Sequence, residues 1–169
     1  GDVEQIAHDL SKCAHQLPVK HQPNTLTTLL QEFLGDTITI REDEPLAQHS
    51  FYRVGGAAEC FVIPHDVPAL AALKLICTER NIPFSIIGCG SNHWFSDLGQ
   101  AGVLCSLQGA PFEQCEINEK AMTVTVGAGV LGVSFLKKLQ TLGFSGLEYM
   151  YGIPGTVGGW LAMNAGAHG

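Results

Sequence analysis

The chain has 169 residues, 46% of them hydrophobic and 15% charged, a composition typical of globular proteins that argues against a disordered chain. A chain of this length buries roughly 70% of its unfolded surface, so we expect a proper hydrophobic core in one domain or two small ones. The formal charge of -7 and a total of only 9 Lys and Arg argue against a nucleic-acid surface, but leave open an anionic ligand bound by backbone N–H groups.

The first residues divide into a short helix and a linker. Residues 1–12, GDVEQIAHDLSK, place Val3, Ile6, Ala7 and Leu10 at helical spacing. Residues 13–24, CAHQLPVKHQPN, contain two prolines and no apolar run, which indicates a linker.

Residues 24–42 predict a helix followed by a strand. The helix begins at Asn24 or Thr25 and ends at Gly35. Its apolar face comprises Leu26, Leu29, Leu30 and Phe33. Residues 37–42, TITIRE, alternate as a strand does.

The middle of the chain alternates between strand and helix patterns. Strands are expected at 58–64, at 83–88 as a buried strand, and at 102–107. The helix between the first two, residues 66–81, has Asp66 as its N-cap. Its inward face comprises Leu70, Leu73, Ile76 and Cys77. The simplest arrangement is a β-α-β unit, a parallel pair of strands with a right-handed crossover.

The second half of the chain has a different pattern. Strands are expected within 112–118 and 122–129, and a helix over 131–143. The apolar face of that helix comprises Phe135, Leu136, Leu139 and Leu142. We therefore predict an α+β fold in which two α+β subdomains, 24–107 and 108–169, meet near residue 108.

A loop with two glycines follows the strand at 83–88. It comprises Gly88, Cys89, Gly90, Ser91 and Asn92. Glycines one residue apart let the chain turn sharply and keep side chains away from successive N–H groups, which suits a pyrophosphate. The loop matches neither the dinucleotide fingerprint, since a third glycine is missing, nor a P-loop. The alternative is a tight turn with no ligand.

The end of the chain, EYMYGIPGTVGGWLAMNAGAHG, is a second glycine-rich stretch. Glycines 152, 155, 158 and 159 surround Pro154, which we expect in the first turn of a short helix whose N–H groups attract an anion. A ligand wall and a glycine-rich helix packed on a sheet fit this pattern equally well. The glycines, Pro154 and Asn164 make a membrane-spanning helix of about 20 residues a poor alternative, and we expect no membrane partner.

The cysteines form no metal-binding pattern. They contain no CxxC, and no pair of them lies near two histidines at zinc-finger spacing, so no metal site is expected. Because no signal peptide is visible, the simplest interpretation is reduced thiols in a cytoplasmic protein.

Four segments taken together resemble a known enzyme family. HSFYRVGGAAECFVIP, IIGCGSN, VTVGAGV and SGLEYMYGIPGTVGGWLAMNAGAHG follow one another as in the UDP-N-acetylenolpyruvoylglucosamine reductases, over residues 45–169. The GxGSN motif recurs across flavin oxidases, whereas GIPGTVGG followed by NAGAxG is specific to this reductase family.

The resemblance implies the FAD-binding fold shared with vanillyl alcohol oxidase, in which FAD lies between two α+β subdomains. It implies that the first loop, Gly88, Cys89, Gly90, Ser91 and Asn92, holds the pyrophosphate. It also implies that the ribityl chain and isoalloxazine are lined by Ile153, Pro154, Gly155, Gly158, Gly159 and Gly166.

The family's reaction is implied as well. NADPH reduces the flavin, which passes a hydride to the enolpyruvyl group of a UDP-sugar in peptidoglycan synthesis. In the family, the serine, arginine and glutamate that complete the reaction follow the NAGAxG motif. We therefore expect residues 1–169 to contain neither the substrate domain nor the catalytic groups and to be inactive alone. We also expect the natural protein to continue beyond residue 169.

Residues 1–23 resemble the last helix of UDP-N-acetylmuramate-alanine ligase together with a linker. This resemblance predicts a ligase domain fused upstream of the reductase.

Single residues carry further expectations. His168 and Trp160 depart from the family pattern, and structural roles are expected for both, with Trp160 in the core. The Asn92 amide is expected to fix its loop, and Arg53 to bond backbone carbonyls or, alternatively, flavin phosphates. Cys89 is interpreted as a spacer. Two alternative functions stay open: another flavin oxidoreductase of the same fold, and a non-catalytic interaction module that has lost flavin.

Overall fold

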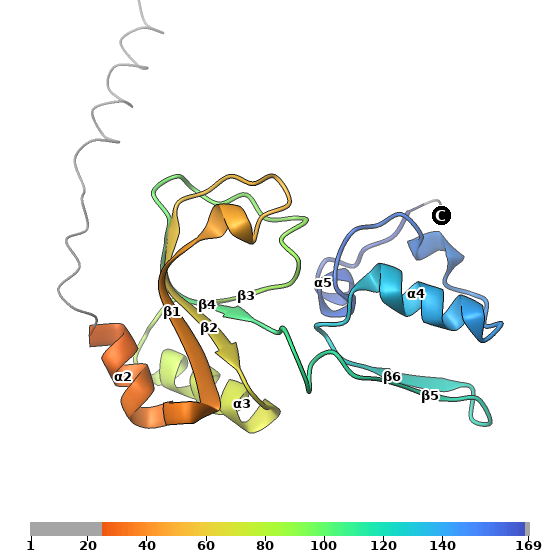
Figure 1. The fold of residues 1–169 in the computed structure, drawn as a ribbon, viewed down its shortest axis with the longest axis horizontal. Coiled ribbons are helices and arrows are strands. Elements are labelled where there is room, and N and C mark those ends of the chain that lie inside the picture. The colour runs from red at the N-terminus through yellow and green to blue at the C-terminus, as the bar shows by residue number, and fades with distance from the viewer. Residues whose placement is uncertain (1–24, 168–169) are drawn as a thin grey trace, which may run out of the picture.

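The structure is a computed structural model that describes residues 25–167. The helix and linker expected over residues 1–24, with the resemblance to a ligase, and the residue His168 lie outside the described residues. In the described part, the chain forms one four-stranded and one two-stranded sheet, each accompanied by helices (Figure 1).

The four-stranded sheet has the order β1-β2-β4-β3. Its strands are β1 (Ile38–Pro45), β2 (Ala57–Pro64), β3 (Phe84–Ile87) and β4 (Gln100–Ser106). Strand β1 is antiparallel to β2, whereas β2 and β3 both run parallel to β4. The predicted direct pairing of the strands at 58–64 and 83–88 is therefore wrong, because β4 lies between them.

Burial explains why β4, and not β3, takes the inner position. Three successive residues of β4 are at most 1% exposed: Val103, Leu104 and Cys105. In β3 only Ile87 is buried, while Ser85 and Ile86 are exposed. The prediction of a buried strand at 83–88 is wrong for this reason, since β3 is an edge strand and an edge tolerates polar residues.

Two helices pack against one face of this sheet: α2 (Thr25–Leu34) and α3 (Val67–Glu79). The predicted N-cap of α3 is confirmed, because the Asp66 carboxylate accepts a hydrogen bond from the Ala69 N–H at 2.7 Å. The predicted apolar face of α2 is wrong at Phe33. This side chain is 55% exposed under the Arg80 guanidinium, and Leu34 is buried in its place.

The second part of the molecule is built on a hairpin. Its elements are β5 (Cys115–Asn118), β6 (Thr123–Val126), α4 (Gly132–Thr141) and α5 (Val157–Ala162). They enclose a second core: Val130, Phe135, Met150, Val157 and Trp160. Leu142, predicted on the apolar face of α4, is 45% exposed because the helix ends one residue before it.

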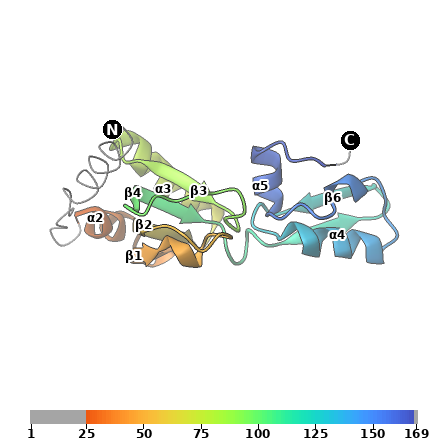
Figure 2. The ribbon, with the colours of Figure 1, turned by 90° about the horizontal axis from the view of Figure 1, so that it is seen from above.

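The two parts lie side by side and are joined by residues 107–114 (Figure 2). The loop that follows β3 extends towards α5 in both ribbon views, so the first part approaches the second at this point. Of the helices in residues 25–167, none is long and apolar enough to cross a membrane.

Candidate functional site

The two glycine loops meet, although they lie far apart in the chain. The hydroxyl of Ser91 donates a hydrogen bond to the carbonyl oxygen of Pro154 over 3.1 Å, across 63 residues. Close by, a Cβ atom added to Gly88 would lie 2.6 Å from the hydroxyl oxygen of Thr156. The predicted binding residues of the first loop are thus brought against residues 154–156 of the second loop.

The first loop is a tight turn at the end of the edge strand β3. Gly90 has a φ of +68°, which favours glycine over residues with a Cβ atom. A Cβ atom at this position would overlap with the carbonyl oxygen of His49. The Gly90 carbonyl in turn accepts a hydrogen bond from the Phe51 N–H at 3.2 Å. Residues 49–51 therefore contact the first loop through the backbone of Gly90 and support it.

The loops carry a set of unused backbone donors. The N–H groups of residues 89–92 donate no hydrogen bond to any residue among 25–167, and the same holds for the N–H groups of residues 155 and 156. Unpaired backbone donors on neighbouring loops are the type of group that can bind an anion without cationic side chains. This feature fits the acidic charge of the chain.

The second loop enters α5 in a different way from the prediction. Thr156 is the N-cap, since its hydroxyl accepts a hydrogen bond from the Gly159 N–H at 3.2 Å. The prediction of Pro154 in the first helical turn is wrong, because Pro154 lies before this cap. Residues 155–157 pair instead with residues 130–132 through the bonds Gly132 N–H to Gly155 O and Val157 N–H to Val130 O, both 2.9 Å.

The glycines of the two loops fall into two groups. At Gly88, Gly90, Gly155 and Gly158 an added Cβ atom would press on neighbouring protein atoms, so close packing alone already requires glycine there. At Gly152 and Gly166 the same atom would meet nothing within 4 Å. Packing therefore accounts for Gly88, Gly90, Gly155 and Gly158, and a φ of +85° favours glycine at position 152, whereas the ligand wall stays a prediction.

One predicted site residue is not brought to the loops by any described contact. Gly166 is exposed beyond the end of α5, and a Cβ atom added to it would meet nothing within 4 Å. The described contact of Gly159 stays within the second loop: its N–H donates to the Thr156 hydroxyl, whose oxygen lies 3.3 Å from where a Cβ atom on Gly159 would be.

Trp160 lies in the core, as predicted, with 6% of its surface exposed. Its indole N–H is buried without a partner in the described part, and the nitrogen lies 2.8 Å from where a Cβ atom on Gly155 would be. The Ser106 hydroxyl, at the end of β4 beside Ile87, is likewise buried and unpaired among residues 25–167. Two unsatisfied polar groups therefore border the loops, where each carries a cost unless a ligand or water pairs with it.

The expectation for the Asn92 side chain is wrong, and one of the two alternatives for Arg53 is not found. The Asn92 amide makes no hydrogen bond with residues 25–167, so its loop is held by Ser91 and by the Gly90 backbone instead. The Arg53 guanidinium bonds no carbonyl in that range, so contact with flavin phosphates stays as the remaining prediction, and the backbone N–H of Arg53 donates to Ser50 O at 3.1 Å. Cys89 is exposed, which is compatible with a spacer.

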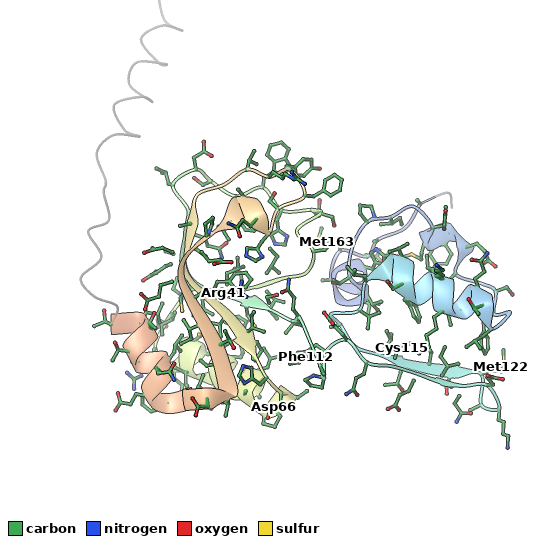
Figure 3. All side chains as sticks on the ribbon, viewed as in Figure 1. Arg41, Asp66, Phe112, Cys115, Met122 and Met163 are labelled. Carbon is green, nitrogen blue, oxygen red and sulfur yellow. The ribbon has the colours of Figure 1, made fainter. Side chains whose placement is uncertain are left out.

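Sequence reasoning missed a polar pair under the first loop. His49 Nε2 and Glu44 Oε1 are 2.7 Å apart, and Arg41 Nη1 lies 3.1 Å from the same carboxylate oxygen. Figure 3 shows Arg41 on β1. The hydrogen bond from His49 lowers the pKa of Glu44, and Arg41 adds to this effect against the opposing effect of burial. Thr156 was missed as well, although a threonine before a helix is a recognised N-cap signal.

A cavity of about 1190 Å³ lies in the second part and shares Ile153 and Pro154 with the second loop. Met122, at the far tip of the β5–β6 hairpin, belongs to its lining (Figure 3). Its wall is mostly apolar, with Lys137 and Glu148 as the charged residues, and no residue of the first loop contributes to it. The unused N–H donors of residues 89–92, 155 and 156 thus lie outside the lining of this cavity.

The sequence of the chain is similar to a known protein family and to several curated proteins. The FAD binding domain family matches residues 58–169. The UDP-N-acetylenolpyruvoylglucosamine reductase of Geobacter metallireducens is 45% identical over 130 residues, which cover 77% of this chain and 42% of that protein. The reductase of Heliobacterium modesticaldum is 35% identical over 144 residues, or 85% of this chain and 44% of that protein. The chain therefore spans less than half the length of these curated relatives.

Solved structures give the same picture. The UDP-N-acetylenolpyruvylglucosamine reductase of Thermus caldophilus superposes with a TM-score of 0.58 and 25% identity, over 78% of this chain and 43% of that one. CrmK, a flavoenzyme involved in caerulomycin biosynthesis, has a TM-score of 0.51 and 14% identity over 63% of this chain and 22% of its own. The second likeness shows the fold alone.

Proposed function

This chain belongs to the FAD binding domain family, and we propose that it is the FAD-holding part of a UDP-N-acetylenolpyruvoylglucosamine reductase. Its fold is the predicted vanillyl alcohol oxidase-type FAD-binding fold. The sequence resemblance to the reductases is confirmed by relatives 35% and 45% identical. The observation that carries the proposal is the meeting of the two glycine loops at the Ser91–Pro154 hydrogen bond.

The unused N–H donors of residues 89–92 fit the pyrophosphate of FAD, because they supply several hydrogen bonds to a dianion at no cost in cationic side chains. We assign the pyrophosphate to the first loop: Gly88, Cys89, Gly90, Ser91 and Asn92. We assign the ribityl chain and isoalloxazine to Ile153, Pro154, Gly155, Gly158, Gly159 and Gly166. The unpaired N–H groups of residues 155 and 156 support the second assignment.

The change of sheet supports a division into two subdomains. Strand β4 ends at Ser106, and β5 begins the second sheet at Cys115. We propose residues 24–107 and 108–169 as the first and second FAD-binding subdomains, with residues 1–23 as a separate segment. The contact between the loops then lies at the boundary between the subdomains.

When bound, FAD supplies hydride transfer. The residues described here bind and orient it: backbone N–H groups hold the phosphates, while the glycines let the loops approach. We propose NADPH as the reductant and a UDP-sugar as the substrate of the whole protein. The relatives are more than twice as long as the matched segments, and we assign the substrate-binding and catalytic residues to the portion of them that this chain does not cover.

We propose that the protein works in the cytoplasm. The cysteines in the described part, Cys60, Cys77, Cys89, Cys105 and Cys115, are all free thiols. Free thiols of this number are typical of a reducing compartment.

A direct experiment is titration of the purified protein with FAD, in which binding is measured by calorimetry and by the change in the melting temperature Tm. We expect saturable binding and a Tm that rises with FAD concentration. A colourless preparation whose Tm is unchanged by excess FAD would favour the non-catalytic interaction module. ADP and riboflavin, the two halves of the cofactor, separate the phosphate site from the flavin site.

A further inference from the structure

We propose that His49 is a positioning residue for the phosphate-binding loop. Its ring fixes the backbone on which Gly90 rests, and so it sets the direction of the N–H groups of residues 89–92. This inference rests on the proposed function, because it concerns the same site. It adds a residue outside both glycine loops, 39 positions before the first of them.

The His49 side chain is held on two sides. Its Nε2 atom lies 2.7 Å from Glu44 Oε1, and because an ionised carboxylate only accepts hydrogen bonds, Nε2–H is the donor. The ring stacks on Phe61, with 4.3 Å between ring centroids and 27° between planes. Phe61 is fully buried, and the side chain of His49 is only 13% exposed. The ring is therefore anchored to the first sheet.

The His49 backbone, in turn, supports the loop. Gly90 approaches the His49 carbonyl so closely that no Cβ atom fits between them. Two residues later, the Phe51 N–H donates to the Gly90 carbonyl at 3.2 Å. These contacts fix both the position of Gly90 and the orientation of its peptide group. A shift of His49 therefore moves the peptide units that carry the unused donors.

The surrounding groups favour a positioning role over a purely stabilising one. The core on this face of the sheet is already closed by buried Leu46, Ile87 and Leu104 beside Phe61. The Glu44 carboxylate has a second partner, since Arg41 Nη1 lies 3.1 Å from the same oxygen. The His49–Glu44 hydrogen bond is thus not needed to close this core, and it lies next to the backbone that contacts Gly90.

His49→Leu and His49→Gln are the informative pair of variants. Leucine keeps apolar bulk on Phe61 but loses the hydrogen bond, whereas the glutamine amide nitrogen is as many bonds from Cα as His Nε2 and still donates to Glu44. His65→Leu is the matched control. His65 also has a ring nitrogen in a hydrogen bond, 2.8 Å from the Thr39 hydroxyl, but within the described part its hydrogen bonds go only to Thr39 and Thr37 on the β1 side, and none goes to residues 88–92.

We expect His49→Leu to weaken FAD and ADP binding about tenfold in calorimetry, the effect of losing a hydrogen bond to a charged group. Riboflavin, which lacks phosphates, should bind unchanged. His49→Gln and His65→Leu should bind all three probes as the wild type does. Equal weakening for riboflavin and ADP, or no weakening for ADP, overturns the positioning role.

A second readout keeps the inference separate from FAD binding itself. In the absence of any nucleotide, hydrogen exchange of the Phe51 amide, which donates to the Gly90 carbonyl, should be faster in His49→Leu than in the wild type, but unchanged in His65→Leu. If wild-type protein binds no FAD, the proposed function fails, while exchange still decides whether His49 positions the loop. Unchanged exchange in His49→Leu overturns the inference in either case.

Discussion

The Ser91 hydroxyl bridges the two parts of the molecule by donating to the Pro154 carbonyl at 3.1 Å. This bond joins the turn after an edge strand of the first sheet to the turn before the last helix of the second part. Both turns also carry backbone N–H groups with no partner in residues 25–167. One hydrogen bond therefore connects two sets of unpaired donors from the two parts of the molecule.

Ser91→Ala should remove this connection and weaken FAD binding by about three- to tenfold, since one hydrogen bond contributes about 0.5–1.5 kcal/mol. Calorimetric titration with FAD measures the effect. The control is Ser85→Ala, because Ser85 is exposed on β3 and makes no side-chain hydrogen bond within the described part. If both variants bind FAD like the wild type, the Ser91 bond does not organise the site.

Gly88→Ala should destabilise the protein by about 1–3 kcal/mol, because the new Cβ atom is forced against the Thr156 hydroxyl. In a chain of this size each kcal/mol lowers Tm by about 2–4 °C, which calorimetry without FAD detects. Gly166→Ala is the matched control, since its Cβ atom would meet nothing within 4 Å. An unchanged Tm for Gly88→Ala would show that the two loops separate without cost.

Gly132→Ala should be destabilising for a different reason, namely overlap of its Cβ atom with the indole ring of Trp160. We expect a loss of about 1–3 kcal/mol in the free energy of unfolding. A smaller side chain in Trp160→Leu should relieve the overlap, so the double variant should lose less than the sum of the single variants. Denaturant unfolding of all four proteins measures this coupling, and strict additivity would contradict the contact.

Most local features could be predicted from the sequence because they depend on neighbouring residues. The Asp66 cap needs only an acceptor three residues before a free N–H, and the Trp160 core position follows from its size. The order of the strands could not be predicted in this way. Three strands of similar apolar character compete for the inner position, and only their packing against two faces decides in favour of β4.

The candidate site, too, could be predicted from the sequence only where it depends on neighbouring residues. Glycine spacing identified both loops, but their contact depends on the path of the 60 or so residues between them, which no local pattern encodes. The start of α5 shows a second limit of prediction from sequence. Pro154 and Thr156 are both residues that commonly begin a helix, and they lie only two positions apart. Pairing of residues 155–157 with 130–132, a long-range effect, made Thr156 the cap.

Glu44 predicts a specific pH dependence. Its pKa lies below the usual 4.5 in the folded protein, chiefly through the His49 hydrogen bond, so its contribution to stability is fully present above that pH. The contribution is lost as pH falls through the lowered pKa. The difference in unfolding free energy between wild type and Glu44→Gln should thus be constant from about pH 7 to 5 and shrink below about 4.5. A difference that stays constant down to about pH 3 would contradict a lowered pKa.

Cys89 provides a test of the phosphate site that needs no mutation. It is exposed within the first loop, whereas burial raises the pKa values of Cys60 and Cys105 to about 12 and keeps both thiols protonated. Since the thiolate is the reactive form, iodoacetamide should label Cys89 in the native protein and leave those two unlabelled until unfolding. Bound FAD, and bound ADP as well, should slow the labelling of Cys89 when peptides are quantified by mass spectrometry, whereas riboflavin should not. Labelling of Cys89 at the same rate with saturating FAD would place the phosphates away from this loop, because a pyrophosphate on the N–H groups of residues 89–92 covers the thiol and repels a thiolate.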